Sequence, residues 1–252
     1  MTCLPASPEL QRGEPVGRDS RLRGNDRTKF VKLKIFFMYI QYLGHSCFKL
    51  TGKDSKGENV ALVLDPFSKD CGLKVPHLEA DILTISHNHH DHNNVDAVKG
   101  NPYVIDTAGE YDVKDIFIQG FDSFHDDKDG KERGGNIIYR VSIEDVVITH
   151  LGDLGQILNT KQLESLEGTD ILLIPVGGKY TLDAKKAVEV INQIEPRMVI
   201  PMHYKTAESK FDINGIESFI KEIGMKPQMI EDKLKINKKD LPQEDMELTV
   251  FK

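Results

Sequence analysis

Apolar positions along this chain fall into short runs first and into helical stripes later. The short runs are rich in β-branched residues and predict β-strands. Gly44 separates the first two runs and suggests a hairpin-like turn there. We expect strands at about residues 33–43, 46–51, 59–64, 82–86, 103–106, 115–119, 136–142, 145–149, 171–175, 197–201 and 246–251.

Two later segments have the spacing of amphipathic helices. The first ends before Pro196, and the second lies between Asp212, a candidate N-cap, and Gly224. A β-rich first part followed by alternating strand and helix predicts an α/β (α+β) fold of two stacked sheets with helices outside. The apolar stripes are Ala184, Ala187, Val188, Ile191 and Ile194, and then Ile213, Ile216, Phe219, Ile220 and Ile223.

The N-terminal part of the chain differs from the rest. It contains Pro5, Pro8 and Pro15 with several Gly and Arg residues, and little apolar periodicity, so it cannot form a core. No continuous apolar stretch follows its charges, which excludes a secretory signal peptide. We expect residues 1–37 to be a disordered or non-native extension and residues 38–252 to form one catalytic domain.

Charge and cysteine content narrow the classes of protein. The net charge is −7, but residues 1–37 hold 8 of the 33 basic and 4 of the 40 acidic residues. The remaining 25 basic and 36 acidic residues give the body a net charge of −11. An acidic body predicts no nucleic-acid partner and no anionic membrane surface. The three cysteines show no paired framework, which favours a reducing cytoplasm. No apolar stretch approaches the length of a membrane span.

Residues 87–92 read His-Asn-His-His-Asp-His, directly after the apolar run 81–86. Such side chains are costly to bury unless they are paired or bound to metal, although a solvated His-rich loop is the alternative interpretation. His87 and His89 are two residues apart, so they point the same way in extended backbone and can bind one ion. Asp91 and His92 then face a neighbouring position. Imidazole and carboxylate suit Zn²⁺, and also Mn²⁺ or Fe²⁺.

Further ligands are expected downstream because two ions need more than four side chains. Three candidates each lie where an apolar run gives way to a loop, which is where α/β proteins place functional residues. They are His125, Asp153 and His203.

The series His-x-His-x-Asp-His, His, Asp, His resembles the ligand series of the metallo-β-lactamase superfamily. Flanking motifs are similar to the branch that contains ascorbate-6-phosphate lactonase, over about residues 38–252. This resemblance implies a four-layer αβ/βα sandwich with metals at one edge between the sheets. The flanking motifs are Tyr42-Leu43-Gly44-His45-Ser46, Leu64-Asp65-Pro66, His150-Leu151-Gly152-Asp153, Pro175-Val176-Gly177-Gly178 and Pro201-Met202-His203-Tyr204.

Carried over residue by residue, the resemblance implies two metal sites. Asp126 follows His125 where similar hydrolases have Gly-His-Thr, so His150 is the rival to His125 as a ligand. His150 could instead orient a ligand in a catalytic role, or form a hydrogen bond at a strand end. The implied sets are His87, His89 and His125 for the first metal, Asp91, His92 and His203 for the second, and Asp153 bridging both.

A function follows from these two metals, with zinc expected first and manganese or iron as alternatives. A metal-bridging hydroxide would attack a small ester, lactone or phosphodiester substrate, with Asp91 holding metal and orienting the hydroxide. Asp65 is expected to brace the His-rich loop, and His45 either lines the pocket or forms a core hydrogen bond. The candidates for substrate contact are Tyr180, Thr181 and Tyr204.

Other functions of the same fold remain as alternatives. Nucleases of this superfamily carry a cap domain or a long basic arm, and neither is evident in this acidic chain. Di-iron oxygen reductases have Glu at the position of His89 and an added flavodoxin domain. A non-catalytic metal-binding member would be expected to have lost ligands, whereas every ligand position is filled here.

The boundary at residue 38 can be tested directly. We hypothesise that Met38 is the true start of the native protein, because the core pattern begins near Lys32 and not before. N-terminal sequencing of the native protein should then read from Met38 or its successor. A mature chain beginning at Met1 would contradict the hypothesis.

Overall fold

The computed structural model describes residues 37–252. The expected extension, residues 1–37, lies outside this range except for Phe37, and so does the first part of the strand expected from residue 33. The proposed division of the chain at residue 38 therefore stays a prediction.

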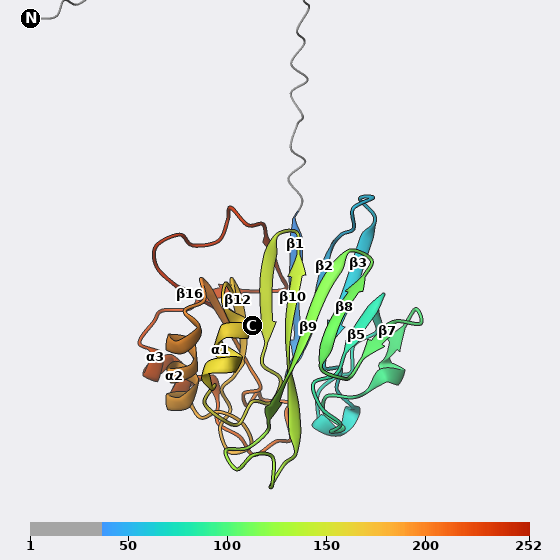
Figure 1. Ribbon diagram of the computed structural model, residues 1–252. Helices are drawn as coiled ribbons and strands as arrows, with labels where there is room; N and C mark the ends of the chain where they lie inside the picture. The colour runs from blue at the N-terminus through green and yellow to red at the C-terminus, as the bar shows by residue number, and fades with distance from the viewer. Residues whose placement is uncertain (1–36) are drawn as a thin grey trace, which may run out of the picture. The chain divides into compact units, whose positions relative to one another are not determined.

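Two large sheets stack face to face (Figure 1). The six-stranded sheet has, in spatial order, β15 (Lys233–Ile236), β1 (Met38–Gly44), β2 (Cys47–Lys53), β3 (Asn59–Leu64), β5 (Ile82–Thr84) and β7 (Tyr103–Ile105). The eight-stranded sheet has β14 (Gln228–Ile230), β16 (Glu247–Phe251), β13 (Met198–Met202), β12 (Ile171–Pro175), β11 (Val146–His150), β10 (Gly135–Ile143), β9 (Ile116–Phe124) and β8 (Gly109–Val113).

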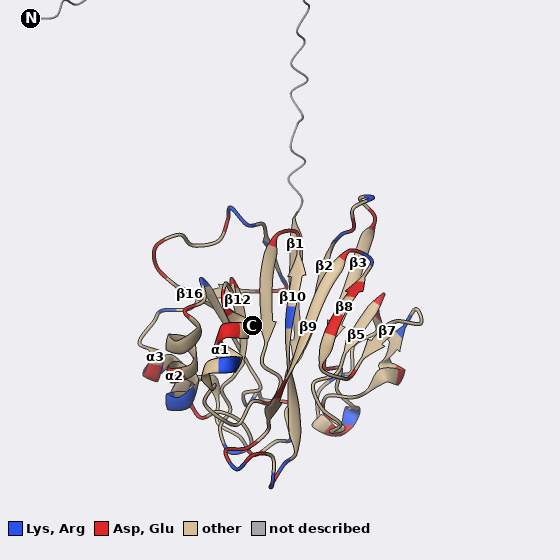
Figure 2. Ribbon diagram, in the orientation of Figure 1, with Lys and Arg blue, Asp and Glu red and all other residues tan. Residues whose placement is uncertain are grey.

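Three α-helices, α1 (Thr160–Leu166), α2 (Ala184–Ile194) and α3 (Ile216–Ile223), cover the outer face of the eight-stranded sheet. Their apolar sides pack on β12, β13 and β16, and Figure 2 shows charged residues on their outer turns. The layer outside the six-stranded sheet instead contains two 3₁₀ helices and a two-stranded sheet, β4 (Leu78–Glu79) with β6 (Val98–Lys99). Within residues 37–252, no helix is long and apolar enough to cross a membrane.

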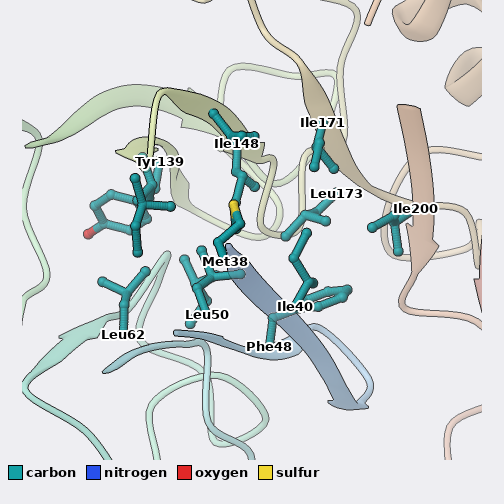
Figure 3. Packing of buried hydrophobic residues seen from close by; sticks show 14 of the residues in the cluster. Met38, Ile40, Phe48, Leu50, Leu62, Tyr139, Ile148, Ile171, Leu173 and Ile200 are labelled. Atoms are coloured by element: carbon teal, nitrogen blue, oxygen red, sulfur yellow. The ribbon is translucent and has the colours of Figure 1, made fainter. Parts of the chain in front are cut away.

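The main core lies between the two sheets and is built mainly from apolar residues of the expected strand segments (Figure 3). Inward side chains of one sheet meet those of the other, and burial of this apolar area is the main stabilising contribution. The labelled members are Met38, Ile40, Phe48, Leu50 and Leu62 from the six-stranded sheet, and Tyr139, Ile148, Ile171, Leu173 and Ile200 from the eight-stranded sheet.

All eleven expected strand segments contain a strand, and the first expected helix is α2. The pattern missed five strands, β4, β6, β8, β14 and β15, and the helix α1. These elements are short, between two and seven residues long, so each offers few positions from which a period can be read. The second expected helix begins later than predicted. Gly215 is the N-cap of α3, so Asp212 and Ile213 lie before the helix, while Gly224 ends it in a left-handed conformation as expected.

Strand direction brings distant parts of the chain to one edge of the sandwich. In the six-stranded sheet, β1, β3 and β5 run in the same direction. In the eight-stranded sheet, β9, β11, β12 and β13 do the same. The carboxyl ends of parallel strands lie at one edge, so the loops that follow these strands are collected there.

Tyr139 connects the two sheets next to this edge. It is fully buried on β10, and its hydroxyl lies 3.0 Å from the carbonyl oxygen of Ile85 and 3.0 Å from that of Ile105, both at the ends of strands of the other sheet. Ile85 precedes the His-rich loop, so this contact also fixes where that loop begins.

Replacing Tyr139 by Phe should lower the free energy of unfolding by about 1–3 kcal/mol, because the change leaves the carbonyl of Ile85 without this donor, while that of Ile105 keeps the backbone N–H of Ile85. Urea unfolding followed by circular dichroism measures this. Tyr103→Phe is the matched control, since Tyr103 is 53% exposed, and it should change stability by less than about 0.5 kcal/mol. Equal effects of the two substitutions would contradict the role of Tyr139.

Candidate metal centre

The loops at this edge bring the seven expected ligands together, and with them His45. His45 follows β1, the His-rich loop follows β5, and His125, Asp153 and His203 follow β9, β11 and β13. The side-chain ligand atoms form three overlapping groups in which all atoms lie within 4.8 Å of one another. The groups are His45, Asp91, His92 and His203; His87, His89 and His125; and His87, His92 and Asp153.

The carboxylate of Asp153 lies at the centre of the cluster. Its Oδ2 atom is 3.1 Å from Nε2 of His125 and 3.2 Å from Nε2 of both His92 and His203. Nε2 of His87 is 3.9 Å away. Two ligands of one tetrahedral zinc ion lie roughly 3.4 Å apart, given metal–ligand bonds of about 2.1 Å. These separations therefore fit atoms that share an ion, and they span members of both expected ligand sets.

In three of these histidines the second ring nitrogen, Nδ1, lies within hydrogen-bond distance of an oxygen outside the cluster. Nδ1 of His92 lies 2.9 Å from Oδ2 of Asp65, Nδ1 of His87 lies 2.9 Å from Oγ of Ser86, and Nδ1 of His125 lies 3.1 Å from the carbonyl oxygen of Tyr180. Each of these nitrogens donates its proton, which leaves Nε2 with a free lone pair facing the cluster. Nε2 of His87 and of His92 is buried without a hydrogen-bond partner among the described residues. Such orphaned acceptors fit a bound cation.

Asp65 holds the His-rich loop from the neighbouring strand, as the sequence suggested. Its Oδ1 accepts the backbone N–H of Ser86 at 2.8 Å, and its Oδ2 accepts the Ser86 hydroxyl at 2.6 Å. The same Oδ2 accepts Nδ1–H of His92. One buried carboxylate thus sets the backbone at the start of the loop and the orientation of a ligand at its end.

Protonation in this cluster reflects burial and mutual charge. Burial, helped by the nearby His92, lowers the pKa of His87 to about 3, so His87 is neutral and able to bind metal at pH 7. Burial opposes ionisation of Asp153, but His203 and His92 hold its pKa well below the usual range. Burial also opposes the charge of His92, but Asp153 and Asp65 raise its pKa well above the usual range. A cation would take the place of that proton.

His45, for which the sequence allows either a pocket-lining or a core role, lies in the cluster. Its Nε2 lies 3.1 Å from Oδ2 of Asp91, and its ring centroid is 4.1 Å from that of His203. Burial lowers the pKa of His45 to about 4, with His203 adding to the effect. A neutral ring that donates Nε2–H would orient the Asp91 carboxylate.

Three residues of this edge have an unusual backbone conformation. His45, Asp65 and His203 have φ angles of 57°, 45° and 53°, in the left-handed region that non-glycine residues rarely adopt. The backbone N–H of His203 donates to the carbonyl of His45 at 2.8 Å, which joins two of these positions across the sheets. Strained residues of this kind concentrate at functional sites, where the surrounding structure holds them in place.

Asn136 and Gly152 position Asp153. The Asn136 side-chain oxygen accepts the backbone N–H of Asp153 at 2.9 Å, and its amide nitrogen donates to the carbonyl of Leu151. A Cβ atom at Gly152 would lie 2.3 Å from that Asn136 oxygen and 2.7 Å from Cβ of Ser86. Only glycine fits this approach, and Gly152 also has a φ of +56°.

Asp126, which follows His125 where similar hydrolases have Thr, has a structural role in its loop. Its two carboxylate oxygens accept the backbone N–H groups of Lys128, Gly130, Glu132 and Arg133 at 2.8–3.0 Å. Asp126 therefore closes the loop that follows β9, and His125 enters the cluster from the start of that loop.

His150 lies beside the cluster and not in it. Its Nε2 is 2.9 Å from the carbonyl oxygen of Ser46, and its Nδ1 accepts the backbone N–H of Gly152 at 3.1 Å. Both ring nitrogens are used in these buried contacts, which leaves none for a metal or a proton transfer. The geometry favours the alternative of a strand-end hydrogen-bonding role, and direct catalysis by His150 has no support.

A cavity of about 320 Å³ opens onto the cluster. Its lining residues are His89, His90, Asp91, His125, Arg133, Asp153, Tyr180, His203 and Phe211. A larger depression of about 490 Å³, lined by Lys49, Glu79 and Asp81 among others, lies elsewhere and contains no such ligand group. The smaller cavity is the candidate active site because it alone of these two contains the metal-binding atoms.

The cavity includes one of the three expected substrate contacts. Tyr180 lines it, whereas Thr181 is buried and does not. Tyr204 packs in the core against Tyr42, with ring centroids 6.2 Å apart, because the residue after His203 turns inward.

Sequence reasoning missed Arg133 and Phe211. Each lies several residues from any ligand motif, so no local spacing indicated either one.

Comparison with known proteins agrees with this geometry. A family model described as the β-lactamase superfamily domain matches residues 39–203. The chain belongs to the metallo-β-lactamase superfamily. The matched segment runs from β1 to His203 and so includes every expected ligand. The expected superfamily and fold are confirmed, while the finer likeness to the lactonase branch stays a prediction.

Several relatives of this superfamily member are named as hydrolases. UPF0173 metal-dependent hydrolases of Staphylothermus marinus and Thermococcus onnurineus are 30% and 29% identical to it, over 66% of this chain and 83% and 84% of theirs. A solved Thermotoga maritima structure assigned to the Zn-dependent hydrolases of the superfamily is 34% identical, with a TM-score of 0.69 over 85% of this chain and 98% of that chain. The protein is a hydrolase, and its own His and Asp cluster is able to bind metal.

The bracing carboxylate gives a test of the centre. Asp65→Asn should weaken zinc binding roughly 10- to 100-fold, because a neutral amide no longer holds His92 in the ligand tautomer. Asn tolerates left-handed backbone as Asp does, so the loop conformation is kept. Competition with a chromophoric chelator measures the affinity. Asp106→Asn, at the exposed end of β7 and two strands from β3, should leave it unchanged. Equal affinities of the two variants would contradict the role of Asp65.

Proposed function

We propose that the protein binds two divalent ions, zinc first with manganese or iron as alternatives, and hydrolyses a small ester, lactone or phosphodiester. The observation that carries the proposal is the single oxygen of Asp153 within 3.1–3.9 Å of four imidazole nitrogens. Two of these histidines belong to each expected ligand set, which supports Asp153 as the bridge between them. His87, His89 and His125 would hold one ion, and Asp91, His92 and His203 the other.

The ions, when bound, would supply a nucleophilic water near neutral pH and polarise the substrate oxygen. The protein residues do the positioning. Asp91 lines the cavity, and Nε2 of His45 lies next to its Oδ2, so Asp91 would orient the attacking water as well as bind metal. Tyr180 supports His125 through its backbone carbonyl and presents its ring to the cavity, where it would contact substrate.

The size of the cavity favours a small molecule. Pockets for small ligands range from about 300 to 1,000 Å³, and this cavity lies at the lower end of that range. The nuclease alternative is less well supported, because a polynucleotide needs clustered Lys and Arg. Arg133 is the one such residue among those lining the cavity, and Figure 2 shows Lys and Arg interspersed with Asp and Glu on the loops. The non-catalytic alternative is weakened by the hydrolase relatives.

His89 provides the cleanest test of the metal mechanism. It is exposed and its ring makes no hydrogen bond within residues 37–252, so His89→Ala should fold normally. The variant should retain less zinc and lose at least about 100-fold in turnover of lactone, phosphodiester or thioester substrates. Metal analysis by mass spectrometry and rate measurements on the same sample give both readouts.

His77→Ala is the matched control, because His77 is an exposed loop residue outside the cluster. It should keep both metal and activity. Full activity of His89→Ala without bound metal would contradict the proposal.

A further inference from the structure

Arg133 brings a positive charge into a cavity otherwise lined by His, Asp and aromatic residues. We propose that the Arg133 guanidinium binds an oxyanion of the substrate, a carboxylate or phosphate that is not itself cleaved, beside the metal centre. This inference rests on the proposed function and adds to it a substrate class: an ester, lactone or phosphodiester with a second, anionic group.

The loop that carries Arg133 is held rigidly. The backbone N–H of Arg133 donates to Oδ2 of Asp126 at 2.8 Å, as part of the four-donor closure of this loop. Asp127 extends the anchoring, because its carboxylate is 3.0 Å from the ammonium group of Lys186 on α2. The loop also begins at His125. The position of Arg133 relative to the cluster is therefore fixed before substrate arrives, which is what a specific binding residue needs.

The guanidinium group is held in position, but its N–H groups make no hydrogen bond within residues 37–252. Its central carbon lies 5.5 Å from the centroid of the Tyr180 ring, a cation–π contact that restrains the side chain and leaves its N–H donors free. Its one ion-pair contact in the described part of the chain is 3.6 Å to Glu132, and these side chains are 31% and 47% exposed. A pair that long and that exposed is weak, so an incoming anion can replace it.

Nearby lysines are already engaged. Lys179 pairs with Asp212, Lys186 with Asp127, and Lys128 with Glu132. The planar guanidinium can bind a carboxylate or phosphate through two parallel hydrogen bonds, which a lysine cannot do.

Phe211 gives the cavity an apolar surface as well. Its ring stacks on that of His45, with centroids 4.7 Å apart and an interplanar angle of 13°. The cavity thus combines three features: metal-binding atoms, an apolar wall and a free guanidinium. A substrate with a scissile bond, a hydrocarbon portion and a remote anionic group would use all three.

Binding of a matched ligand pair to the zinc-loaded full-length protein tests the proposal. 3-Phosphonopropionate and propylphosphonate share the phosphonate that would bind the ions, and only the first has a carboxylate to reach Arg133. Calorimetry should show that the wild type binds 3-phosphonopropionate roughly 10-fold more tightly than propylphosphonate. Arg133→Ala should abolish that preference while still binding propylphosphonate, and Arg133→Lys should retain part of it.

Lys131→Ala is the matched control, since Lys131 belongs to the same loop but pairs weakly with Asp129 in solvent. It should keep the wild-type preference. Equal binding of the two ligands by the wild type, or a preference that survives in Arg133→Ala, would overturn the role of Arg133 and leave the metal centre in place. Binding of neither ligand, or binding indifferent to zinc, would overturn the metal-centre proposal and this inference together.

Discussion

The fold converges on one unfavourable concentration of charge, the buried Asp153 carboxylate surrounded by imidazole groups. Without a cation, the four rings must either share protons with the carboxylate or present lone pairs to it. The raised pKa of His92 and the depressed pKa of Asp153 show that the buried carboxylate is stabilised by positive charge beside it. Surrounding residues maintain the arrangement: Asp65 and Ser86 hold rings through Nδ1, and Asn136 holds the Asp153 backbone. An arrangement that is costly when empty and favourable when loaded is what a metal site requires.

Topology explains how so many loops reach that point. The strands that precede the site run in one direction within each sheet, so their following loops meet at one edge of the sandwich. Tyr139 fixes one sheet against the other close to this edge. The helices and the 3₁₀ turns cover the outer faces and do not contribute ligands. The expected ligands therefore lie on loops, and the two packed sheets hold these loops in fixed positions.

Much of this could be predicted from local sequence. β-Branched runs located eleven strand segments, since a buried strand leaves a clear apolar pattern. Exposed edge strands such as β8 and β14 left none, and α3 began after Asp212 because Gly215 is the N-cap. His87, His89, Asp91 and His92 were recognisable because four ligand types on one short loop have no packing explanation.

The sequence by itself determined the fold class and the ligand chemistry, because periodicity and residue type are local properties. Only the tertiary structure decided which side chains face each other. It placed His45 against Asp91, gave both ring nitrogens of His150 to backbone groups, turned Tyr204 into the core and brought Arg133 to the cavity. Those outcomes depend on contacts between residues far apart in the sequence, such as His150 and Ser46 at a separation of 104 positions, and no local pattern encodes them.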